Sequence, residues 1–304
     1  MNVDKPKASE LVINWHITEA CNYACRYCYA HWCKPRQREL LHNEAQVKAL
    51  LTAIYEYFTK QGGLCALNPE ADLTSIRLNI AGGEPLLYPE QVTSICQIAH
   101  ELGMKVSLIS NASRLNFELM SRLAPYLSLL GLSLDSANEQ INQRIGRITN
   151  QGQLLNLNDT LLAVKYGQKI NSSMSLKVNT VVNKANCQEN MTALIDQFSP
   201  SRWKVLRMLP VLNSNLAISD CEFRSFIDRH SQHKRVMRIE GNDEMSESYL
   251  MIDPMGRFYQ NNPKGTDQGY VYSTEILEAG INSALNEINF SINKFLKRYR
   301  GLVT

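Results

Sequence analysis

Short apolar segments alternate with amphipathic segments along the first two thirds of this sequence. The apolar segments fit β-strands and fall at 11–18, 76–80, 105–110, 129–134, 175–182 and 203–206. Helical periodicity separates them and is clearest at Val47, Leu50, Leu51, Ile54 and Phe58, which share one face. Six strand–helix units in about 200 residues predict an α/β fold, a partial (β/α)6 TIM-like barrel with a parallel sheet.

The pattern changes after Pro210. We expect a helix over 223–230, a hairpin over 249–259 that turns at Pro254–Gly256, and one helical tail over 281–296. The chain is therefore expected to have three parts: a short tail (residues 1–10), the barrel (residues 11–210) and a C-terminal substrate-binding cap (residues 211–304).

Composition and charge exclude several classes of protein. With 304 residues, 44% hydrophobic and 20% charged, the chain is typical of a folded enzyme-sized protein. Its net charge of +3 is too small for a protein that coats a nucleic-acid polymer or an anionic membrane. No signal peptide is readable, and no segment reaches the roughly 18 apolar residues of a membrane span. We expect a cytoplasmic monomer that binds neither a nucleic-acid polymer nor a membrane.

Three of the eight cysteines are crowded together. Cys21, Cys25 and Cys28 form a C-x3-C-x2-C pattern directly after the first strand. Three thiolates at this spacing can bind three irons of a 4Fe–4S cluster and leave the fourth iron open to another ligand. A zinc site that recruits Cys33 or His31 is one alternative, and unliganded free cysteines are another. The spacing and the position after the first strand favour the cluster.

The end of the second strand carries a second motif, Ala81-Gly82-Gly83-Glu84-Pro85. Together with the cysteine pattern, this motif resembles the radical S-adenosylmethionine (SAM) enzymes. The closest resemblance is to the viperin family, in its prokaryotic form that lacks the N-terminal amphipathic helix of the animal proteins. Further matching segments lie at 110–113, 132–136, 145–147, 176–179, 201–205 and 248–250.

This resemblance implies the cofactors and the reaction. The cofactors would be a 4Fe–4S cluster and SAM, and the substrate a nucleoside triphosphate (CTP, UTP or GTP). A 5′-deoxyadenosyl radical would abstract the ribose 4′-hydrogen. Loss of the 3′-hydroxyl, with one more electron and a proton, would then give a 3′-deoxy-3′,4′-didehydro nucleotide. A flavodoxin- or ferredoxin-type electron donor and a role in antiviral defence are also implied.

The resemblance also assigns residues. It places the cluster on Cys21, Cys25 and Cys28. The expected SAM-binding residues are Gly82, Gly83, Glu84, Asn111, Ser133 and Arg147. Glu84 could instead support the turn structurally. Tyr249 would lie near the substrate ribose as a catalytic residue, with core packing as the alternative.

Charged residues on the expected strands point to an anion site without any resemblance. Residues two apart on a strand share a face, so Arg77 lies with Asn79, Lys177 with Asn179, and Arg202 with Lys204. If these faces point inward, four cations converge, and few acidic residues lie on those strands to neutralise them. We therefore expect a triphosphate to supply the counter-charge. The alternative is that they reach solvent. The resemblance agrees, although lysine is usual at the position of Arg77. The expected substrate contacts are Arg77, Asn79, Lys177, Arg202, Lys204 and Tyr249.

Two other functions remain open. One is a radical SAM enzyme that modifies another phosphorylated metabolite or a peptide, although peptide-maturing relatives usually carry further C-terminal cysteines and none follows Cys221. The other is a non-catalytic zinc or nucleic-acid-binding module, whose basic residues would lie on an exposed helix or loop. Base recognition is also open, because Asn261 to Pro263 depart from the family pattern just before Lys264 and Gly265.

Overall fold

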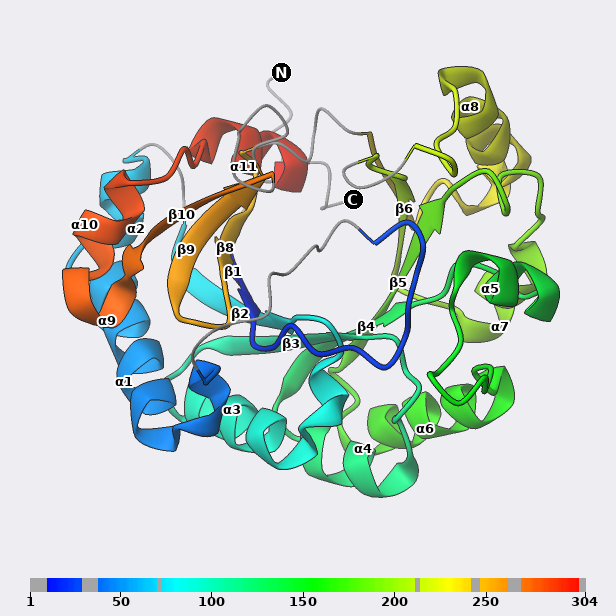
Figure 1. Ribbon diagram of the computed structural model, residues 1–304. Helices are drawn as coiled ribbons and strands as arrows, with labels where there is room; N and C mark the ends of the chain where they lie inside the picture. Colours follow the sequence, from blue (N-terminus) through cyan, green and yellow to red (C-terminus); the bar gives the residue numbers. More distant parts are fainter. Residues whose placement is uncertain are drawn as a thin grey trace, which may run out of the picture.

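A computed structural model describes residues 10–28, 38–69, 73–210, 214–241, 247–261 and 269–300. The strands within these ranges form one ten-stranded sheet, ordered β10-β9-β8-β1-β2-β3-β4-β5-β6-β7. Figure 1 shows this sheet as an open, curved wall with helices along its outer side. The predicted α/β fold with a partial, unclosed barrel is confirmed.

Six parallel strands make the centre of the sheet, and each pairs with the next one in sequence. All six segments predicted as strands are present. Their bounds are β1 Glu10–His16, β2 Ser75–Ala81, β3 Lys105–Ser110, β4 Leu127–Ser133, β5 Ser175–Val182 and β6 Arg202–Arg207.

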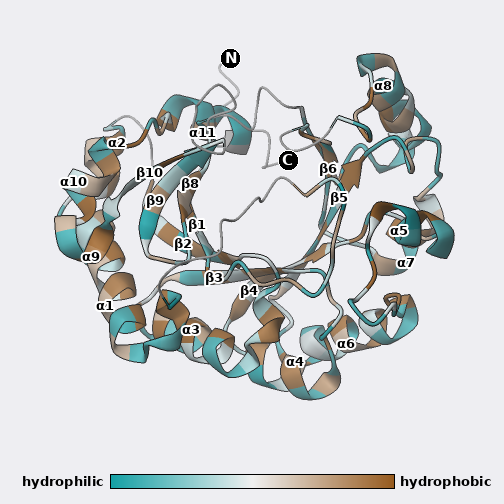
Figure 2. Cartoon of the chain, viewed as in Figure 1, coloured by the Kyte–Doolittle hydropathy of each residue, from teal (hydrophilic) through white to brown (hydrophobic). Residues whose placement is uncertain are grey.

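Amphipathic helices cover the outer side of these strands, and Figure 2 shows them striped with hydrophobic and hydrophilic residues. In α1, the predicted apolar face is buried and the Asn43 side chain caps the first turn by accepting from the Gln46 amide. The main helices are α1 Glu44–Tyr55, α3 Pro89–Glu101, α4 Phe117–Leu123, α6 Leu157–Ile170 and α7 Thr192–Phe198. The short helices are α2 Gly63–Leu67 and α5 Glu139–Ile145, with single turns at 40–42, 56–60, 85–87 and 231–233.

Strand alternation decides which side chains face the inside of the barrel. Along β5, buried residues alternate with partly exposed ones. Trp203 on β6 is fully buried, and its indole Nε1 donates to Thr180 Oγ1 of β5 at 2.9 Å. Burial of a tryptophan contributes about 3–5 kcal/mol, so it fixes the orientation of β6. Its neighbours Arg202 and Lys204 consequently face the interior with Lys177.

The last third of the chain lengthens the sheet at both edges. Strand β7, Met237–Glu240, pairs with β6 at one edge. At the other edge β8, Leu250–Ile252, pairs in parallel with β1, and β9, Arg257–Asn261, and β10, Tyr270–Glu275, follow antiparallel. The predicted hairpin is confirmed as β8 and β9. Residue 210 therefore marks a change in sequence pattern and not an edge of the sheet.

The helices of this last third are α8 Asp220–Arg229, α9 Ile276–Ala279, α10 Ile281–Asn286 and α11 Ile292–Arg300. The prediction of one helix over 281–296 is wrong, because the helix is interrupted between α10 and α11. Residues distant in sequence stabilise the connection between the two helices. The Ser291 amide donates to the Glu247 carbonyl, and the Glu287 carboxylate accepts from the Thr274 amide. No helix in the described ranges is long and apolar enough to cross a membrane.

Candidate functional site

The cysteine loop follows β1 at the carboxyl edge of the sheet. Two backbone hydrogen bonds of 2.8 Å tie it to the end of β2, from the amides of Gly83 and Glu84. A third bond, 2.9 Å long, ties it to the end of α5. Cys21 and Cys28 are exposed, Cys25 is half-buried, and none of the three forms a disulfide within the described residues. The loop is therefore held firmly while its thiols stay available.

The two glycines of the turn allow this close approach. Gly82 has φ of +153°, and a Cβ there would lie 2.7 Å from the Thr18 carbonyl oxygen. A Cβ at Gly83 would lie 2.2 Å from the carbonyl oxygen of Ala20. Real Cβ atoms do not come this close to oxygen, so larger residues would push the loop away.

The Glu84 carboxylate is fully buried beneath this turn. It accepts from the Leu86 amide at 2.9 Å, the Ser110 hydroxyl at 2.8 Å and the Asn111 amide at 2.7 Å. Burial raises its pKa, although these three donors oppose the shift. The contacts fit the structural alternative for Glu84, and direct contact with a cofactor stays a prediction.

Three further residues expected around the cofactor lie beside the same loop. The Asn111 side chain donates to Asn22 of the loop at 3.0 Å. The Arg147 guanidinium, 7% exposed, donates to the Tyr27 hydroxyl at 3.2 Å and also to the Ser133 carbonyl. The structure thus brings Asn111, Ser133 and Arg147 together at the carboxyl edge.

The described residues contain no group of three or more cysteine, histidine or carboxylate side chains arranged around one metal ion. A cluster does not require such an arrangement, because each thiolate binds a different iron. Cys33 and His31, the extra ligands of the zinc alternative, lie outside the described residues, as do Lys264 and Gly265.

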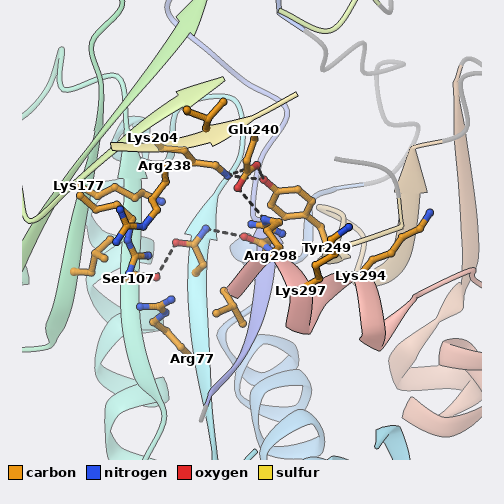
Figure 3. Close-up of a pocket in the computed structure, with 16 residues that line it drawn as sticks. Arg77, Ser107, Lys177, Lys204, Arg238, Glu240, Tyr249, Lys294, Lys297 and Arg298 are labelled. Atoms are coloured by element: carbon orange, nitrogen blue, oxygen red, sulfur yellow. Dashed lines mark hydrogen bonds and ion pairs between the residues drawn. The ribbon is translucent and has the colours of Figure 1, made fainter. Parts of the chain in front are cut away.

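A cavity of about 420 Å³ lies deeper inside the barrel, toward the amino ends of the strands (Figure 3). All the expected substrate contacts line it, namely Arg77, Asn79, Lys177, Arg202, Lys204 and Tyr249. The predicted convergence of four cations from three strands is therefore present in the structure.

Lys177 is a buried lysine surrounded by other cations of this pocket. Burial lowers its pKa well below the usual value, and repulsion from Lys204, Arg77, Arg202 and Arg298 adds to the shift. In the part of the chain that the structure describes, its ammonium has no ion-pair partner. An anion in the cavity would relieve this repulsion.

Two of the other cations have carboxylate partners on other strands, although no acidic residue lies on the three strands that carry the four cations. Arg77 lies 3.6 Å from Glu10 of β1, and Lys204 lies 2.8 Å from Glu240 of β7. Neither partner was predicted, because both lie on other strands than the cations. The interior is thus partly neutralised before any ligand binds.

Amide side chains lie within the cation-lined cavity and beside it. Asn79 donates to Asn14 of β1 at 2.9 Å and accepts from the Ser107 hydroxyl at 2.7 Å. Asn179 pairs in register with Ser133 on one side and Lys204 on the other. Its Oδ1 atom is buried and has no hydrogen-bond partner among the described residues. Asn179 therefore lies between the carboxyl-edge residues and the cations.

Tyr249 belongs to both the core and the pocket. Its ring packs against Met251, Tyr259 and Tyr270, as the packing alternative expects. Its hydroxyl points into the cation-lined cavity, where it accepts from Lys204 Nζ at 2.5 Å.

Several pocket residues were missed in the sequence analysis. Those from β7 lie on a strand of four residues, which is too short for a recognisable apolar pattern. Those from α11 are spaced three and four apart, a spacing that could have indicated a basic helix face. The missed lining residues include Asn14, Ser107, Arg238, Glu240, Lys294, Lys297 and Arg298.

Comparison with known proteins agrees with this architecture. Residues 15–174 match the sequence profile of the Radical SAM superfamily. The S-adenosylmethionine-dependent nucleotide dehydratase of Pseudoalteromonas ulvae is 37% identical over 303 residues, covering 99% of this chain and 97% of that protein. The protein of the same name from Psychrobacter lutiphocae is 38% identical over 302 residues, covering 98% of each. Native anSMEcpe with bound AdoMet shares the fold with a TM-score of 0.61 at 14% identity, covering 95% of this chain and 83% of that one.

The superfamily implies a 4Fe–4S cluster and SAM, and the donor set at the carboxyl edge fits the cluster. Three cysteines on one anchored loop, none of them in a disulfide within the described residues, supply the soft sulfur ligands that iron prefers. Burial raises the pKa of Cys25 to about 12, so its thiol is protonated in the absence of metal. Iron binds the thiolate, and the proton would therefore be released on binding. The adjoining Gly82-Gly83 turn is a second motif that resembles the same superfamily.

The match to the superfamily profile, the 37–38% identity to relatives over nearly the full length and the architecture of the site all support one assignment. The chain belongs to the viperin-like S-adenosylmethionine-dependent nucleotide dehydratases of the radical SAM superfamily.

Proposed function

We propose that the substrate of this dehydratase is a nucleoside triphosphate, CTP, UTP or GTP, whose phosphate chain occupies the cation-lined pocket. The observation that carries the proposal is the convergence of Arg77, Lys177, Arg202 and Lys204 on one cavity. A polyphosphate would relieve the repulsion at Lys177 and accept charge-assisted hydrogen bonds from its neighbours.

The carboxyl edge is the proposed cofactor side. Cys21, Cys25 and Cys28 would hold the cluster, and the Gly82-Gly83 turn would border SAM. When bound, this pair supplies a 5′-deoxyadenosyl radical that abstracts the ribose 4′-hydrogen. We propose SAM contacts from the three residues that the structure gathers at this edge, which are Asn111, Ser133 and Arg147. Glu84 would act by holding the Asn111 amide in place.

The ribose would lie between the two halves of the site. Asn179 offers a buried amide oxygen that has no hydrogen-bond partner among the residues described. Tyr249 offers a hydroxyl at the edge of the cation cluster. We propose that both orient the ribose for loss of the 3′-hydroxyl as water. This step would take one further electron, from the external electron donor, and one proton, and it yields the 3′-deoxy-3′,4′-didehydro nucleotide. Water exclusion by the surrounding barrel protects the radical chemistry.

Four expectations accompany this proposal. The electron donor would be a flavodoxin- or ferredoxin-type protein, and the enzyme would be a cytoplasmic monomer. Its biological role would be antiviral defence. Each stays a prediction from the sequence and its resemblance.

Anaerobic turnover tests the substrate directly. The reconstituted, reduced enzyme is incubated with SAM and each nucleoside triphosphate in turn, and products are followed by mass spectrometry. We expect 5′-deoxyadenosine together with a nucleotide lighter by one water. SAM cleavage that no nucleoside triphosphate stimulates would refute the proposed substrate.

A further inference from the structure

A buried carboxylate lies among the cations of the pocket. Glu240, on β7, is 7% exposed, and its oxygens accept from three other segments (Figure 3). Lys204 Nζ of β6 lies 2.8 Å away, the Tyr249 hydroxyl before β8 donates at 2.6 Å, and Arg298 Nε of α11 donates at 2.9 Å. This one carboxylate therefore connects the β6–β7 edge of the sheet to the residue before β8 and to the last helix.

Glu240 is ionised throughout the neutral range. Burial opposes its charge, but Lys204 and Arg298 outweigh burial and lower its pKa to about 2. In turn, burial lowers the pKa of Lys204 to about 8, a shift that Glu240 opposes and that Arg298 and Arg202 increase. The carboxylate thus keeps a buried ammonium charged in the ligand-free pocket.

The donors that Glu240 occupies are those that a phosphate would use. An ammonium, a guanidinium and a phenolic hydroxyl all bind phosphate oxygens well. Arg298 also lies 3.4 Å from the centre of the Tyr249 ring, so the donors form one packed group. A phosphate placed against this group would meet a fixed negative charge at close range.

We propose that Glu240 is an internal counter-anion of the polyphosphate site. It holds Lys204, Tyr249 and Arg298 together while the pocket is empty, and it yields at least one cation when a phosphate chain enters. The inference rests on the proposed function, since it assumes a polyphosphate ligand. It adds a specificity rule: a ligand must carry enough phosphates to compete with Glu240 and also reach Lys177.

Glu240→Gln tests this competition with inorganic tripolyphosphate as the probe. Removing the charge should make tripolyphosphate bind about tenfold more tightly in calorimetric titrations, equivalent to about 1.4 kcal/mol. Without ligand, the variant should melt below the wild type, because buried cations lose their carboxylate partner. Saturating tripolyphosphate should narrow this gap, because the ligand stabilises more strongly the form that binds it more tightly.

Glu247→Gln is the matched control. This substitution also removes one negative charge from a carboxylate that pairs with α11, since Glu247 lies 2.6 Å from Lys294. The Glu247 side chain is 43% exposed, so solvent screens its charge. Its tripolyphosphate affinity should stay within about twofold of the wild type.

A crystal structure of the wild type with tripolyphosphate gives a second readout that does not depend on a variant folding. Lys204 Nζ or Arg298 Nε should have left Glu240 for a phosphate oxygen. Retention of all three Glu240 contacts, or an unchanged or weaker affinity in Glu240→Gln, would overturn this inference alone. No tripolyphosphate binding by the wild type would overturn the polyphosphate site itself, and both proposals with it.

Discussion

Replacing Lys177 with methionine should stabilise the ligand-free protein and weaken its hold on polyphosphate. Methionine keeps a long, flexible side chain without the ammonium. In the described part of the chain this ammonium has no acidic partner, and burial and neighbouring cations lower its pKa well below the usual value. We therefore expect the Lys177 ammonium to destabilise the ligand-free fold and to contribute to polyphosphate binding.

The magnitude follows from the charges around Lys177. Two cations roughly 6 Å apart repel by about 3 kcal/mol at an effective dielectric constant of 20. Replacement of a buried ion pair by apolar residues is often neutral or stabilises proteins by about 1–4 kcal/mol, and Lys177 lacks even the compensating partner. We expect a gain within this range, and each kcal/mol should raise the melting temperature by roughly 2–4 °C. Losing a charged hydrogen-bond donor should weaken tripolyphosphate binding at least about tenfold.

The stabilisation also has a defined pH dependence. The folded pKa of Lys177 lies below its unfolded value of about 10.4, so between these values the unfolded chain binds more protons. The wild type therefore gains stability relative to the variant as pH rises through this window, by up to about 1.36 kcal/mol per pH unit. The advantage of Lys177→Met should shrink accordingly.

Urea unfolding near neutral pH and near pH 10, with calorimetric titration of tripolyphosphate, measures all three effects. Lys165→Met is the matched control, because Lys165 is exposed on α6 and its loss should change little. A Lys177→Met protein that is less stable than the wild type at neutral pH, or that binds tripolyphosphate equally well, would refute the reasoning.

Three further predictions concern the two ends of the site. Gly83→Ala should displace the cysteine loop, because its Cβ would lie 2.2 Å from the Ala20 carbonyl oxygen, and iron analysis after reconstitution should show reduced cluster content. Cys25→Ser should abolish the iron–sulfur absorbance and Cys65→Ser, exposed on α2, should keep it; equal absorbance would contradict the ligand assignment. Tyr249→Phe should cost about 1–3 kcal/mol in urea unfolding, because the buried carboxylate on β7 loses a donor, and should lower kcat more than it raises KM.

The strands and the inward cations could be predicted from the sequence because the pattern behind them is local. A β-strand turns successive side chains to opposite faces, so Trp203 on the apolar side places Lys204 on the other. The cysteine loop and the Gly82-Gly83 turn were likewise visible as short motifs. Their contact followed from parallel strands ending at one edge.

The partners of the cations could not be predicted in this way. Glu240 lies on a four-residue strand whose existence depends on pairing with β6. Strand β8 pairs with β1 although more than two hundred residues separate them in sequence, and α11 reaches the pocket through Arg298. Such contacts depend on tertiary packing, which local periodicity does not encode.

The central claim is that the phosphate chain of the substrate binds the cations inside the barrel. Its most direct test is the kcat/KM of dehydration for one nucleoside and its mono-, di- and triphosphate, measured anaerobically with the wild type and Lys177→Met. We predict a steep rise toward the triphosphate that the variant largely loses. Equal turnover of the nucleoside and its triphosphate, or an unchanged rise in the variant, would contradict the account.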